Sequence, residues 1–142
     1  MNRKCTNLPF LVLMQASKGI QESMRLEMSK YNLSITEFSV LEVLYLKGKR
    51  TIQQIGHSIL ISSGSMTYVI DGLEKKGLIY RSACPDDRRA IHVALTDDGN
   101  SFMEDIMPKH HQWVENVFSS LNLEESEIFV NLLSKVSQNV KK

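Results

Sequence analysis

Apolar residues recur at helical spacing along most of the chain. From residue 13 to residue 31 they return every three, four or seven positions, and this period predicts one long helix. Stripes of the same kind predict further helices that contain residues 38–45, 52–59, 66–73, 102–121 and 128–140. Pro108 lies inside the segment 102–121, where a proline is expected to kink the helix or divide it into two.

Polar residues mark the expected helix starts. Side chains that can cap a helix stand before five of these stripes, at Ser34, Thr51, Ser62 or Ser63, Thr96 and Asn122. The first two have capping-box spacing, because Glu37 and Gln54 follow them three residues later. Gly48 and Gly77 then stand where two of the helices are expected to end.

The apolar period changes from about 3.6 to 2 after Gly77. Residues 78–82 predict a strand, residues 84–87 a turn, and alternating apolar residues from Ile91 to Leu95 a second strand. Two short helices joined by a turn are typical of a helix-turn-helix, and the hairpin after them would be its wing. The sequence therefore predicts a mainly α fold of the α+β winged-helix type, with six helices and a two-stranded wing.

The domain organisation follows from the same pattern. We expect a single domain over residues 1–142, with a winged helix-turn-helix DNA-binding region at 34–95 and dimerisation helices at 1–33 and 97–142. The terminal helices exceed what one small winged domain needs for its own core, so a second subunit is their expected cover. Such a two-fold protein would read two half-sites separated by about one DNA turn or a multiple of it.

Composition places the chain among ordinary globular proteins. Its 142 residues are 42% hydrophobic and 23% charged, which argues against disorder. No apolar run is long enough to span a bilayer, and the N-terminal segment lacks the pattern of a signal peptide. Two cysteines are too few for a disulfide framework. We therefore expect a cytoplasmic protein that makes no membrane contact.

The formal net charge of +1 hides an uneven distribution. Eight basic and four acidic residues lie from Lys47 to His92, whereas nine basic and twelve acidic residues make up the remainder. A basic middle within an acidic scaffold is typical of a segment that faces nucleic acid, although scattered surface charge gives the same counts. The charge pattern gains weight only together with the predicted helix-turn-helix.

Enzyme chemistry has no motif in this chain. We find no nucleophile elbow, phosphate-binding loop or metal triad. His110 and His111, with Glu115 beyond them, offer at most two metal ligands on one helix face, and two ligands are not a site. The sequence therefore predicts neither an enzyme nor a bound metal or other cofactor.

One segment carries a specific family motif. Residues 87–99 read D-R-R-A-I-H-V-A-L-T-D-D-G, which follows a wing pattern of D-x-R, alternating apolar residues and L-T-x-x-G. Together with residues 33–38, 61–67 and 73–79, this motif makes the chain similar to the MarR family of transcriptional regulators over nearly its whole length. The resemblance implies a homodimeric winged-helix protein that binds operator DNA, usually as a repressor, and is released by a small molecule or by cysteine oxidation.

Three further segments refine the resemblance. Residues 53–56, residues 63–71 and the helix that bears His110 are similar to the branch of the family that responds to quinones and hydroquinones. This similarity implies a stress-response repressor on a pseudopalindromic operator, released by a small phenolic or quinone effector. A thiol-based redox repressor that uses Cys5 is the alternative, and a winged helix that contacts only proteins is a third interpretation.

The resemblance also assigns roles at the DNA interface. Arg89 matches the wing arginine that enters the minor groove, and Asp87 the acid that orients it, because a carboxylate two residues away can fix a guanidinium. A solvated turn pair is the alternative. The remaining expected DNA contacts lie in the wing, on the first helix of the motif and at the start of the recognition helix: Arg88, Gln53, Ser63, Ser65, Thr67 and Tyr68. Capping explains any single hydroxyl among them equally well.

Effector and redox candidates are also implied. The family's effector cleft lies between the dimerisation helices and the winged region, and its expected wall residues here are Phe10, Met14, Phe38, Tyr45 and Met103. Core packing is the alternative for each. Cys5, expected just before the first helix beside Arg3 and Lys4, has cations that lower a thiol pKa, whereas Cys84 in the wing turn is expected to be a spectator.

Overall fold

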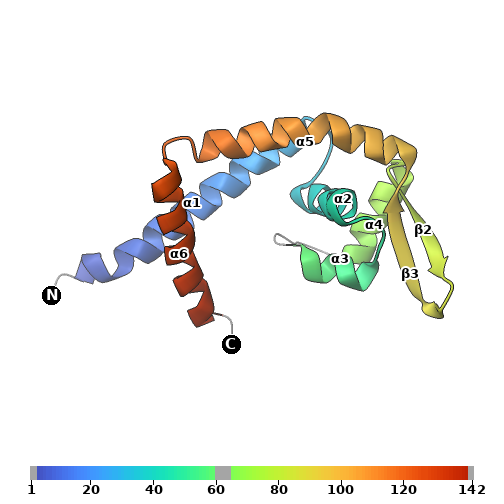
Figure 1. The fold of residues 1–142 in the computed structure, drawn as a ribbon, viewed down its shortest axis with the longest axis horizontal. Coiled ribbons are helices and arrows are strands. Elements are labelled where there is room, and N and C mark those ends of the chain that lie inside the picture. Colours follow the sequence, from blue (N-terminus) through green and yellow to red (C-terminus); the bar gives the residue numbers. More distant parts are fainter. Residues whose placement is uncertain (1–2, 60–64, 141–142) are drawn as a thin grey trace. The chain divides into compact units, whose positions relative to one another are not determined.

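The structure is a computed structural model that describes residues 3–59 and 65–140, apart from the side chains of residues 3–6 and 88. The chain forms two compact units, Met1–Ile106 and Met107–Lys142, and each is described by itself. The elements, labelled in Figure 1, are α1 (Arg3–Ser29), α2 (Ile35–Lys47), β1 (Arg50–Thr51), α3 (Ile52–Ser58), α4 (Met66–Lys75), β2 (Ile79–Cys84), β3 (Asp87–Leu95), α5 (Asp97–Val117) and α6 (Leu123–Val140). These elements confirm the predicted mainly α winged-helix fold.

Reciprocal caps fix three of the helix starts. The Ser34 hydroxyl accepts from the Glu37 amide at 3.0 Å, while the Glu37 carboxylate accepts from the Ser34 amide at 2.9 Å. Thr51 with Gln54 makes the same pair of bonds at 3.1 and 2.9 Å, at the start of α3. At α6 the bonds between Asn122 and Glu125 are 2.8 and 3.0 Å long. The capping boxes of α2 and α3 and the cap of α6 are confirmed.

The core of the first unit is built around α2, which packs against α1, α3, α4 and β3. Its members are the apolar side chains that the helical stripes and the alternating strand turn inward. The largest that are fully buried are Phe38, Met28, Leu41, Ile55, Ile70, Leu73, Ile79, Met103 and Ile106. Since burying one such side chain stabilises a fold by about 1.5–3 kcal/mol, this cluster holds the winged region together.

The wing is a three-stranded antiparallel sheet in the order β1-β3-β2, one strand more than predicted. The added strand β1 contains only Arg50 and Thr51, which pair with Val93 and His92. Two polar residues carry no apolar alternation, so the period-2 pattern could not reveal them. The β2–β3 ladder shifts register between Ala83 and Cys84, next to the hairpin turn.

The L-T-x-x-G segment joins the wing to α5 by close contacts. The Thr96 hydroxyl donates to the Gly77 carbonyl at 2.6 Å and accepts from the Gly99 amide at 3.0 Å, which caps α5. A Cβ atom on Gly99 would lie 2.0 Å from the carbonyl oxygen of Leu78. Glycine is therefore required at residue 99, and Gly77, with φ of +77°, ends the preceding helix in a left-handed conformation.

Some predicted boundaries differ from the structure. Helix α1 begins at Arg3, ten residues before the apolar stripe, and includes Pro9. Helix α5 continues through Pro108 as one helix, so the expected division does not occur. The predicted caps Ser62 and Ser63 lie outside the described residues. Within the described parts of the chain, no helix combines the length and the apolar character needed to cross a bilayer.

Candidate DNA-binding interface

Helix α4 separates an apolar face from a polar one. Val69, Ile70 and Leu73 are buried, while Thr67 and Tyr68 are exposed, and 79% of the Tyr68 surface is accessible. The N-cap residue is Ser65, which is exposed and makes no capping bond with its side chain, so its hydroxyl remains available to a ligand. The predicted contact Ser63 lies outside the described residues. The first turns of α4 thus present hydroxyl groups and an aromatic ring to solvent.

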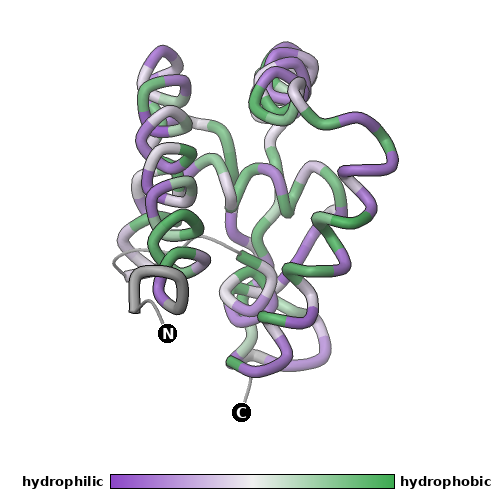
Figure 2. Tube along the Cα trace, turned by 90° about the vertical axis from the view of Figure 1, so that its left-hand side faces the viewer, coloured by the Kyte–Doolittle hydropathy of each residue, from purple (hydrophilic) through white to green (hydrophobic). Residues whose placement is uncertain are grey.

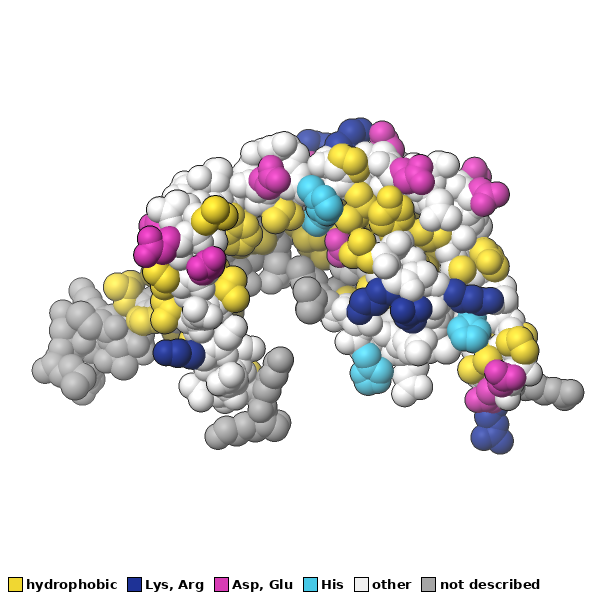
Figure 3. Space-filling model, viewed as in Figure 1, with side chains coloured by type: hydrophobic (Ala, Val, Ile, Leu, Met, Phe, Trp, Pro, Cys, Tyr) yellow, Lys and Arg dark blue, Asp and Glu magenta, His cyan; other side chains and the backbone are white. Residues whose placement is uncertain are grey.

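The hairpin tip holds Asp87 and Arg89 in a defined turn. The Asp87 carboxylate accepts a hydrogen bond of 2.9 Å from the backbone amide of Arg89, whose side chain is exposed. The acid therefore fixes the backbone of the arginine, whereas we expected it to hold the guanidinium. Basic side chains project beyond acidic ones at this tip (Figure 3). The predicted contact Arg88 has a backbone in β3, and its side chain lies outside the described atoms.

The structure brings the wing and α3 together around one recess. This recess has a volume of about 210 Å³ and is lined by Thr51, Ile52, Gln53, Arg89, Ala90 and Ile91. Gln53 and Arg89, predicted separately as DNA contacts, therefore share a surface. Because Gln53 is exposed in the first turn of α3, its amide can donate to an acceptor that enters the recess beside Arg89.

Arg81 joins the recognition helix to the wing, and the sequence did not single it out. Its guanidinium donates to Glu74 at 2.7 Å and to Asp71, both on α4. The hydrogen bond to Asp71 raises the pKa of Arg81 above its usual value, so the bridge stays charged at any physiological pH. Both acids of α4 are thereby neutralised, which lowers the repulsion between this helix and a phosphate backbone.

The comparisons with known proteins agree with this geometry. The sequence model described as MarR family matches residues 33–91. The HTH-type transcriptional regulator MhqR of Bacillus subtilis is 42% identical over 132 residues, which cover 93% of this chain and 91% of that protein. The chain belongs to the MarR family. It is thus a DNA-binding transcriptional regulator.

Solved structures of MarR-family proteins show the same fold. A structure that describes the regulation of DNA binding of Bordetella bronchiseptica BpsR by 6-hydroxynicotinic acid is 27% identical, with a TM-score of 0.79 over 92% of this chain and 98% of that one. The MarR-family regulator Sco3205 of Streptomyces coelicolor in complex with DNA gives a TM-score of 0.89 at 17% identity, over 100% of this chain and 91% of that one. MarR-family neighbours bind operator DNA as dimers, and some bind small-molecule effectors.

The predicted wall residues of a MarR-family effector cleft do not gather in one place. Phe38 and Met103 have no accessible surface and belong to the core, so their assignment to a cleft wall is wrong. Tyr45 is half-buried in α2, whereas Phe10 and Met14 are exposed on α1. The sequence could not separate these cases, because adaptable apolar residues serve cores and clefts alike.

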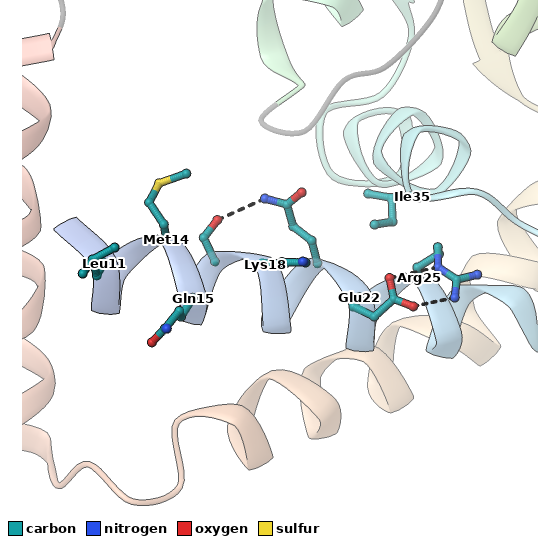
Figure 4. A pocket seen from close by; sticks show the side chains of 9 residues that line it. Leu11, Met14, Gln15, Lys18, Glu22, Arg25 and Ile35 are labelled. Atoms are coloured by element: carbon teal, nitrogen blue, oxygen red, sulfur yellow. Dashed lines mark hydrogen bonds and ion pairs between the residues drawn. The ribbon is translucent and has the colours of Figure 1, made fainter. Parts of the chain in front are cut away.

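A groove does run along α1, and Met14 is the one predicted wall residue that lines it. Figure 4 shows this groove, which has a volume of about 620 Å³ and is lined by Leu11, Met14, Gln15, Ser17, Lys18, Gln21, Glu22, Arg25 and Ile35. Arg25 donates to Glu22 at 2.6 Å, and this hydrogen bond lowers the pKa of the Glu22 carboxyl. The groove therefore combines apolar side chains with a paired, charged end.

The predicted thiol and histidine candidates are placed as follows. Cys5 lies within α1 and not before it, and Cys84 is a free, half-buried cysteine at the end of β2. His110 stacks on Trp113, with ring centres 5.9 Å apart, and burial lowers the pKa of its imidazole. Among the described side chains, no three His, Cys, Asp or Glu residues are grouped to hold a metal ion.

Proposed function

We propose that this chain is a homodimeric repressor that binds a pseudopalindromic operator. In this proposal the residues from Ser63 to Tyr68 enter the major groove of each half-site, and Arg89 enters the flanking minor groove. The observation that carries it is the exposed polar face of α4, which a salt bridge from Arg81 ties to the wing that bears Arg89. A rigid connection between two DNA-reading elements is what a groove-spanning contact requires.

A second copy of the chain is proposed as the cover of the terminal helices. No residue of α6 is buried, and its apolar side chains face solvent (Figure 3). Figure 2 shows hydrophobic residues along the helix that begins at the N-terminus and along the helix that leads to the C-terminus. The large exposed members are Leu8, Phe10, Leu11, Val12, Met14, Ile128, Phe129, Val130, Leu132, Val136 and Val140. Apolar surface of this extent is typical of an interface between subunits.

A small aromatic molecule that bears hydroxyl or keto oxygens is proposed as the effector. The groove along α1 offers Leu11, Met14 and Ile35 for an aromatic ring, and the amides of Gln15 and Gln21 for its oxygens. Bound there, the effector would favour a dimer whose two recognition helices no longer match the half-site spacing, and DNA affinity would fall. The regulation of BpsR by 6-hydroxynicotinic acid supports this ligand class.

The experiment is a fluorescence-anisotropy titration of the full chain against DNA from upstream of its own gene. It is run with and without 2-methylhydroquinone or benzoquinone, and repeated with Cys5→Ser. We expect tight, salt-dependent binding that the effector abolishes in both proteins. Release only in the protein that retains Cys5 would replace the groove by a thiol switch. Binding that does not depend on salt or on sequence would favour a winged helix used for protein contacts.

A further inference from the structure

Lys76 connects the end of the recognition helix to the turn between α1 and α2. Its ammonium group donates to the backbone carbonyl of Asn32 at 2.5 Å and to the carboxylate of Glu37 at 3.0 Å. These partners precede Lys76 by 44 and 39 residues, so the contact joins segments that are distant in sequence. We refer to Lys76, Asn32 and Glu37 as the Lys76 clasp.

Glu37 performs two tasks in this clasp. One carboxylate oxygen accepts from the Ser34 amide in the capping box of α2, and the other accepts from Lys76. Only 17% of the Glu37 side chain is accessible, against 37% for Lys76. A shielded, charge-assisted contact of this kind is stronger and more directional than a surface ion pair.

The turn that the clasp holds has a special backbone. Asn32 has a φ of +58°, and α1 ends three residues before it, at Ser29. This turn therefore sets the direction in which α1 leaves the winged region. The capture of its carbonyl by the last turn of α4 links the direction of α1 to the direction of α4.

We propose that Lys76 is a positioning residue, which fixes the orientation of the recognition helix relative to α1 and thereby sets the half-site spacing that the dimer accepts. This inference rests on the proposed function, in which α1 contributes to the dimer and α4 reads DNA. Lys76 acts on operator recognition through Asn32 and Glu37 and makes no contact with DNA itself.

The neighbouring Lys75 provides a matched control. It is exposed in the same turn of α4 and makes no hydrogen bond or ion pair with any residue that the structure describes. Lys76→Ala and Lys75→Ala remove the same charge, but only the first opens the clasp. Glu37→Gln opens it from the other side, because the glutamine carbonyl still caps Ser34 while the carboxylate is lost.

Charge and positioning predict opposite signs for the two clasp variants. Losing a positive charge at Lys76 weakens DNA binding electrostatically, whereas losing a negative charge at Glu37 strengthens it. Loss of positioning acts in the same direction in both variants. We measure dissociation constants for operators whose half-site separation is optimal or changed by one base pair, at several salt concentrations. The spacing preference is the ratio of the two constants.

We expect Lys76→Ala and Glu37→Gln each to reduce the spacing preference by roughly three- to tenfold, a size typical of losing one charge-assisted hydrogen bond. Lys75→Ala and Lys76→Arg should keep the wild-type preference, and Lys76→Ala should keep the wild-type salt slope. A salt slope that falls by about one in Lys76→Ala would make Lys76 a phosphate contact and overturn the proposal. An unchanged preference with a lower Tm would reduce the clasp to a structural role and also overturn it.

A second measurement does not depend on DNA. Amide hydrogen exchange of the full chain should become faster in Lys76→Ala both in the turn at residues 30–33 and in the last turn of α4. Faster exchange in α4 alone would show that the turn is held without Lys76, and would overturn the clasp. If the wild-type chain bound no DNA, the proposed function would fail while this measurement still decided whether Lys76 couples the two segments.

Discussion

Asp71 of the recognition helix accepts a hydrogen bond from Arg81 of the wing strand β2, ten residues further along the chain. The same guanidinium reaches Glu74, one helical turn beyond Asp71. Since α4 and β2 meet the DNA in different grooves under the proposed function, this bridge decides whether both grooves can be read together.

Arg81→Ala is expected to weaken operator binding by roughly tenfold and to lower the free energy of unfolding by about 1 kcal/mol. The variant leaves two acids of α4 without their cation, next to the phosphate backbone. Anisotropy titrations and urea denaturation measure the two effects. Lys49→Ala removes one charge from an exposed residue of the same basic segment and controls for net charge. Equal losses in the two variants would contradict a role for the bridge.

Arg89→Ala tests the wing tip. We expect operator affinity to fall by about 1–3 kcal/mol, because a guanidinium in a narrow minor groove gains from its enhanced negative potential. Asp87→Asn is the matched variant, since its amide oxygen can still accept from the Arg89 backbone. It should retain most of the affinity, whereas Asp87→Ala should lose part of it. Wild-type affinity in Arg89→Ala would refute the wing assignment.

Sequence periodicity predicted most of the fold because local chemistry sets it. The caps at Ser34, Thr51 and Asn122 and the apolar stripes decide where helices begin and which face they bury. Contacts across the chain were not predictable in this way. Arg81 and Lys76 each find partners on other elements, and nothing in their own neighbourhood in the sequence indicates those partners.

The candidate site was predicted less evenly than the fold. Gln53 and Arg89 were assigned from the family motif, and the structure adds that they line one recess. Phe38 and Met103 were assigned to a cleft and lie in the core. An apolar residue satisfies a core and a ligand pocket by the same physical property, so the assignment needs the surrounding packing.

Gly99→Ala tests the junction between the wing and α5. The added methyl group would lie 2.0 Å from the Leu78 carbonyl oxygen, which belongs to the backbone and cannot move aside cheaply. We expect a loss of several kcal/mol in the free energy of unfolding, of the order of severe overpacking. Gly19→Ala is the control, because nothing lies within 4 Å of its added methyl group in the middle of α1. That variant should be neutral or more stable by up to about 1 kcal/mol. Thermal denaturation at one fixed protein concentration compares the two, and equal Tm values would contradict the close approach.

His110 makes stability depend on pH in a defined direction. Burial lowers the pKa of its imidazole in the folded chain below the unfolded value of about 6.5, so the unfolded chain binds more protons between those two values. The contribution of His110 to stability is therefore complete above about pH 6.5 and is lost as the pH falls toward the folded pKa. Urea denaturation between about pH 5 and 8 should show this decline in the wild-type chain and a shallower one in His110→Gln. The same substitution at the exposed His57 is the control, and a pH profile that His110→Gln leaves unchanged would exclude His110 as its source.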